Sequence, residues 1–191
     1  MSQEINKRNL PSLADLHHDM QTAFKQDQLN LLLNQPVPAA WIKDHPFAKN
    51  VKYIPIEKVE FLLTRIFQEW RVEILNEGQL FNSVYCKVRL HYKNPLTGEW
   101  SFHDGVGAVD VQTAKGESAA DLSKIVSNAV MKALPAAESY AIKDAAEKLG
   151  ELFGKNLNRK DTMAFSGAYS NETMWTKQKE NINGKQVTTN S

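Results

Sequence analysis

The chain has 191 residues, a formal net charge of +1 and one cysteine. This length suits a single domain of ordinary size with tails, and Cys86 alone excludes an intramolecular disulfide and a cysteine-cluster zinc site. No stretch approaches the ~18 apolar residues of a membrane span, and residues 1–10 are polar with no apolar run behind them. We therefore expect a cytoplasmic protein with no membrane partner.

Two helices are predicted at the start of the chain. The first begins at Ser12, which can cap it, and apolar residues then recur at three- and four-residue spacing until Pro36 and Pro38 end the pattern. A second helix is predicted over 56–68, where the apolar residues fall on one side.

Three strands are predicted next, because apolar and polar residues alternate with a period of two. The alternating runs are 70–74, 84–92 and a third that starts at Trp100 and continues toward Gly105 and Gly107. These glycines are expected to let the third strand bend or bulge. Residues 76–78 and 94–98 carry turn chemistry, which predicts an antiparallel meander.

Two further helices are predicted to close the domain. An apolar stripe spans 122–134, and Pro135 separates it from an alanine-rich helix over 137–153, whose small side chains allow close packing against the sheet. The predicted fold is α+β, an antiparallel β-β-β meander packed by helices. Its parts are an N-terminal helical segment (1–40), a core domain (41–160) and a flexible polar tail (161–191).

Several motifs approach catalytic signatures without completing them. Gly105 and Gly107 lack the third glycine of a dinucleotide-binding loop, and the segment 150–155 lacks the spacing and the Ser or Thr of a phosphate-binding loop. His17 and His18 are adjacent, so on a helix they cannot converge on one metal ion. We expect no catalytic site, no metal and no cofactor.

Positive charge is concentrated in part of the chain. Lys and Arg outnumber Asp and Glu by nine to six over 41–93, whereas residues 94–154 are acidic. The polar side of the second strand carries two cations flanked by two rings, namely Tyr85, Lys87, Arg89 and His91. The cations of such a strand can bind a phosphate backbone, and the rings nearby can stack on bases. The alternative is a solvated outer strand.

Residues 41–159 also contain segments of a known family in the same order. These are 51–56 leading into a helix, 70–74, 88–90, the glycine segment 103–107, and 141–149 running on to Phe153 and Gly154. In this order and spacing the chain resembles single-strand annealing proteins of the Rad-fifty-two type, which include phage annealases related to Redβ and Erf.

The resemblance implies a β-β-β-α core that assembles into homo-oligomeric rings or helical filaments in a bacterial host cell. Single-stranded DNA would lie in a continuous basic groove, with base edges outward so that Watson–Crick pairing tests a complementary strand. This annealing, in homologous recombination, needs no ATP and no cofactor. Implied partners are single-stranded DNA, the annealed duplex intermediate, other copies of the chain, and a phage exonuclease or a single-strand-binding protein.

Nine cations are the candidate DNA-binding residues. Lys52, Arg89 and Lys148 are expected to contribute most. Eukaryotic members of the family carry a Lys-Arg pair where this chain has Glu147 and Lys148, so only Lys148 keeps the charge. The weaker candidates are Lys49, Arg71, Lys87, Lys115, Lys143 and Lys155.

Two other interpretations stay open at the level of sequence. The α-β-β-β-α order also describes a double-stranded RNA-binding domain, although the segment 119–124 is too acidic for the lysine-rich helix start of that module. The chain could also be a structural oligomeric protein whose basic strand is merely solvated.

Overall fold

The computed structural model describes residues 20–45, 49–118 and 121–162. The chain divides into two compact units, one formed by residues 1–32 with 164–191 and the other by residues 33–163. In the first unit the described element is the helix α1 (Met20–Leu33). The helix start predicted at Ser12 and nearly all of the predicted tail lie outside the described residues. Within the described residues, no helix is long and apolar enough to cross a membrane.

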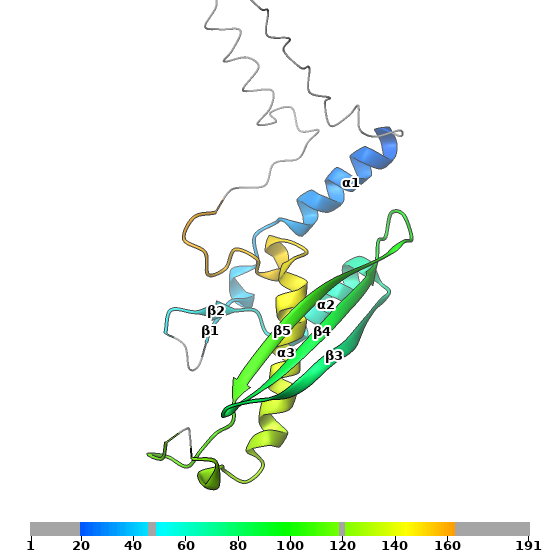
Figure 1. Ribbon diagram of the computed structural model, residues 1–191. Helices are drawn as coiled ribbons and strands as arrows, with labels where there is room; N and C mark the ends of the chain where they lie inside the picture. Colours follow the sequence, from blue (N-terminus) through cyan, green and yellow to red (C-terminus); the bar gives the residue numbers. More distant parts are fainter. Residues whose placement is uncertain (1–19, 46–48, 119–120, 163–191) are drawn as a thin grey trace, which may run out of the picture. The chain divides into compact units, whose positions relative to one another are not determined.

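The second unit has the predicted α+β fold. Its centre is a three-stranded antiparallel meander of β3 (Trp70–Leu80), β4 (Ser83–Lys93) and β5 (Trp100–Asp110), in that spatial order. The long helix α3 (Ala129–Glu147) runs across one face of this sheet (Figure 1). Along β4, every second residue is buried against the helices. These residues are Val84, Cys86, Val88 and Leu90.

Close packing between α3 and β5 depends on small residues on both elements. A Cβ atom at Gly105 would lie 2.1 Å from the carbonyl oxygen of Ala141, and one at Gly107 would lie 2.1 Å from that of Ala137. β5 pairs with β4 without a register shift, so the glycines do not produce the bulge that was one of the two predicted outcomes. They let the backbone of α3 approach the sheet.

A second helix covers the same face of the meander. The helix α2 (Ile56–Phe67) matches the prediction for 56–68, and it buries Val59, Leu62, Leu63 and Phe67. The Phe67 ring packs 4.9 Å from the ring of Tyr92 on β4. The short elements η2 (Ala39–Trp41), β1 (Lys43–Asp44) and β2 (Lys52–Tyr53) precede α2, and η4 (Glu151–Phe153) follows α3.

The first predicted turn is wrong. Residues 76–78 continue β3, with a register shift between Ile74 and Asn76, and the chain reverses instead at Phe81 and Asn82. Gly78 pairs with Tyr85, and a Cβ at Gly78 would lie within 3.1 Å of the Tyr85 ring. The glycine therefore makes room for a cross-strand ring rather than a turn.

The prediction of two closing helices separated by Pro135 is also wrong. Residues 122–124 form the short 3-10 helix η3 (Leu122–Lys124), Ile125 makes a β-bridge with Thr113, and α3 runs through Pro135 as one helix. Proline removes the hydrogen bond to the carbonyl four residues earlier. That residue is Met131, which is 77% exposed, so water can satisfy its carbonyl.

The two faces of the meander differ. We call the face away from α3 the open face. Its side chains alternate with the buried ones, and it includes Arg71 and Glu73 of β3, Lys87, Arg89 and His91 of β4, and Trp100, Phe102, Asp104 and Val106 of β5.

Candidate functional site

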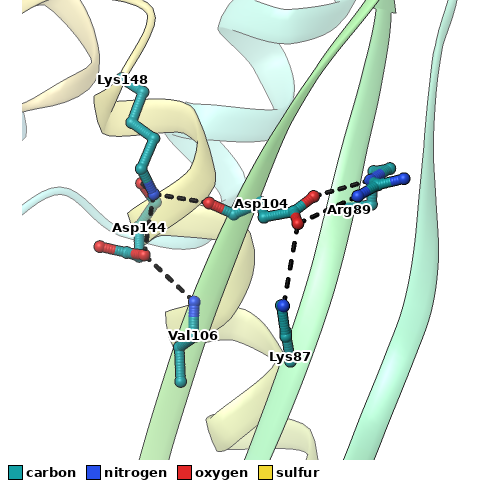
Figure 2. Close-up of polar contacts among 6 residues, drawn as sticks. All are labelled: Lys87, Arg89, Asp104, Val106, Asp144 and Lys148. Carbon is teal, nitrogen blue, oxygen red and sulfur yellow. Dashed lines mark hydrogen bonds and ion pairs between the residues drawn. The ribbon is translucent and has the colours of Figure 1, made fainter.

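Two of the predicted DNA-binding residues converge on Asp104 across neighbouring strands. Arg89 and Asp104 are partners in the β4–β5 register. The guanidinium donates from Nε to Oδ1 at 2.7 Å and from Nη2 to Oδ2 at 3.1 Å, and Lys87 Nζ lies 3.9 Å from Oδ2 (Figure 2). The hydrogen bond from Arg89 lowers the pKa of the Asp104 carboxyl. Asp104 therefore stays ionised and orients both cations.

Lys148 reaches the same residue from α3. Its Nζ donates to the backbone carbonyl of Asp104 at 2.5 Å and to the Asp144 carboxylate at 3.1 Å, and that carboxylate accepts from the backbone N–H of Val106 at 3.1 Å (Figure 2). These two backbone groups of β5, the edge strand of the sheet, bond to side chains of α3. Lys148 and Asp144 thus cap the edge of β5, and Lys148 is held in a fixed position.

A second group lies around a cavity of about 240 Å³ between the β2 region and α3. We call it the Lys143 pocket. Lys143 Nζ lies 4.2 Å from the ring centroid of Tyr140 and 4.9 Å from that of Tyr53. Burial lowers the pKa of Lys143 and raises the pKa of Glu147, which also lines the pocket. The pocket therefore holds a partly buried lysine beside two aromatic rings and a partly buried carboxyl group.

Lys52 lines the same pocket, and its backbone is fixed by a distant residue. The Lys52 N–H donates to Asn158 Oδ1 and its carbonyl accepts from Asn158 Nδ2, both at 2.8 Å. The Lys52 side chain remains exposed. Asp144 lines the pocket as well as binding Lys148, so it joins the Lys143 pocket to the cluster around Asp104.

The remaining candidates are not part of these groups. Lys49, Lys115 and Lys155 are exposed and lie in three separate turns. Arg71 lies on the open face, with its guanidinium 5.2 Å from the ring centroid of Trp100. The structure thus brings together five of the nine predicted residues, which are Lys52, Lys87, Arg89, Lys143 and Lys148.

Sequence reasoning missed the aromatic residues beside these cations. The guanidinium of Arg89 lies 4.1 Å from the ring centroid of Phe102, and His91 lies 6.1 Å from the same ring. A signal for Trp100 and Phe102 was present, because they alternate with the glycines of β5. Once Gly105 and Gly107 face a helix, the even-numbered residues must face away from it. For Asn158 the sequence carries no signal, because its contact spans most of the chain.

No group of three or more His, Cys, Asp or Glu side chains that could hold a metal ion occurs in the part of the chain that the structure describes. Comparison with models of known protein families gives no match, and comparison with curated protein sequences gives none either. The resemblance to single-strand annealing proteins stays a prediction from the sequence segments given above.

Proposed function

We propose that this chain binds single-stranded DNA and anneals complementary strands without ATP, as an oligomeric member of the phage-type single-strand annealing proteins. One observation carries the proposal: five predicted phosphate-binding cations from β2, β4 and α3 form a track. It runs from Lys52 and Lys143 in the pocket, past Lys148 at the edge of β5, to Arg89 and Lys87 on the open face.

The chemistry of this track suits a phosphate backbone. Cations that contact phosphates give affinity without sequence preference, because they release counterions from the nucleic acid. Around the edge of β5, the three cations Lys87, Arg89 and Lys148 face two carboxylates, those of Asp104 and Asp144. The two carboxylates hold the cations in place. Recognition of sequence would then be left to base pairing between the two strands.

The salt dependence of binding tests this assignment. A labelled oligonucleotide is titrated at several salt concentrations against the wild type and the Lys52→Ala, Arg89→Ala and Lys148→Ala variants. We expect each variant to bind more weakly whatever the base sequence, with the log–log salt slope reduced by roughly 0.7 per lost phosphate contact.

The control is Lys132→Ala, which removes an exposed lysine of α3 outside both groups. It should bind like the wild type. Unchanged slopes in all three test variants, with folding intact, would place the DNA elsewhere. A preference of the wild type for duplex RNA would favour the double-stranded RNA-binding interpretation instead.

A further inference from the structure

The open face of the meander exposes aromatic rings that the phosphate track does not use. Trp100 is 47% exposed and Phe102 is 52% exposed, and both belong to β5. On the same face, neighbouring β4 presents the cations Lys87 and Arg89 and the ring of His91. Arg89 lies opposite Asp104, and His91 lies opposite Phe102. Half-exposed aromatic rings leave apolar surface in contact with water. Apolar surface beside polar groups often marks a binding site.

Each ring is accompanied by a guanidinium. Arg89 is held over Phe102 and paired with Asp104, whereas Arg71 lies over Trp100 and makes no ion pair within the described residues. A guanidinium beside an aromatic ring presents a flat stacking surface together with donors that match phosphate oxygens. The pair of Arg71 and Trp100 therefore offers both halves of a nucleotide-binding contact.

We propose that bases of the bound single strand stack on Trp100 and Phe102, with Arg71 and Arg89 directed to the adjoining phosphates. This inference rests on the proposed function. Stacking uses the flat face of a base and is tolerant of sequence, because every base has such a face. It also leaves the Watson–Crick edge free, which an incoming complementary strand needs. A nucleic acid suits this face better than an apolar protein partner, because each ring is paired with a cation.

An abasic strand separates stacking from phosphate binding. Two oligonucleotides of equal length are compared, an oligo-dT and a strand of abasic sites with the same phosphates. Loss of a stacked base costs about 1–3 kcal/mol. We therefore expect Trp100→Ala and Phe102→Ala each to weaken oligo-dT binding by roughly 5- to 150-fold and to leave binding of the abasic strand unchanged. Lys52→Ala should weaken both.

Two control variants test whether the effect is specific to the aromatic rings of the open face. Trp100→Phe keeps a ring and should retain most of the oligo-dT affinity. Phe61→Ala removes a ring of α2 that is 54% exposed and lies outside the open face, and it should bind both strands like the wild type.

Other outcomes overturn the inference. Equal binding of the two strands by the wild type, or equal losses on both strands in Trp100→Ala, would show that the rings do not stack on bases and would leave the proposed function standing. Unchanged binding together with dissociation of an oligomer would assign the face to a second copy of the chain. Binding of neither strand by the wild type would overturn the proposed function as well.

Discussion

The covered and open faces of the meander are built from the same three strands and obey different constraints. On the covered face, Val88 and Leu90 are fully buried and Gly105 touches the backbone of α3, so the available space decides which residue fits. On the open face, alternate residues of the same strands place cations beside rings and beside the carboxylates of Glu73 and Asp104. Substitutions on the first face should change stability, and substitutions on the second should change binding.

The largest expected effect is a loss of stability on the covered face. Gly105→Ala would place a methyl group 2.1 Å from the carbonyl oxygen of Ala141, so the helix must move away from the sheet. We expect a loss of about 3 kcal/mol or more in the free energy of unfolding, measured by urea denaturation. Val106 follows Gly105 along β5, and its side chain lies on the open face. Val106→Ala should therefore cost less than about 1 kcal/mol in the free energy of unfolding. Similar stabilities for the two variants would break the distinction between the faces.

The turn between β3 and β4 belongs to neither face and should respond in the opposite direction. Phe81 has a φ of +55° and is 86% exposed. Only the first of the two turn residues has a positive φ, an arrangement that favours glycine there. Phe81→Gly should therefore raise the free energy of unfolding by about 1 kcal/mol. A loss of stability in the same denaturation experiment would mean that the ring packs against another part of the protein.

On the open face, the carboxylate of Asp104 should restrain binding. Asp104→Asn removes the charge that pairs with Arg89, so both cations become available to phosphate. We expect oligonucleotide affinity to rise about two- to fivefold at low salt, with Asp110→Asn at the end of β5 as the unaffected control. Tighter binding by neither or by both variants would contradict a specific role for Asp104.

The ion pair of Asp104 also makes the stability of the fold depend on pH in the acidic range. Its pKa is lower in the folded state than in the unfolded chain, so the ion pair stabilises the fold above the ordinary aspartate pKa. This stabilisation is lost as the pH falls through the lowered pKa. In acid titrations of unfolding, Asp104→Asn should therefore show a smaller loss of stability than the wild type.

The smallest effect concerns the Lys143 pocket, which combines burial with charge. Burial lowers the pKa of Lys143, while Glu147 and Glu57 oppose that shift. As the pH rises, DNA affinity should therefore begin to fall earlier than for an exposed lysine. Lys143→Arg remains charged throughout this range, so its affinity measured against pH should stay level. Parallel profiles for the two proteins would show that Lys143 does not contact the strand.

The sequence predicted the parts of the fold that depend on local patterns. The alternation along 84–92 and the apolar side of 56–68 are visible in the chain itself, and both elements are confirmed. The errors occurred where cross-strand packing or solvent exposure overrides a local signal. Gly78 was read as a turn but gives space to Tyr85, and Pro135 was read as a helix break but lies on the solvent side of α3.

The site was predictable to a lesser extent. Charge pattern and resemblance named the cations of the track, but neither could show that Asp104 and Asp144 hold Lys148 at the edge of β5. That contact depends on how closely α3 approaches the strand, which the two glycines decide. The orientation of the Trp100 and Phe102 rings depends on the same packing of α3 against β5, because the rings face outward only if the glycines face the helix.

The central claim is tested most directly by annealing without nucleotide. Two complementary oligonucleotides, each carrying one dye of an energy-transfer pair, are mixed with the purified protein in buffer free of ATP. The account predicts that the protein accelerates duplex formation well beyond the spontaneous rate, and that Lys52→Ala and Trp100→Ala reduce this acceleration while Lys132→Ala does not. No acceleration by the wild type, or acceleration only when ATP is added, would contradict it.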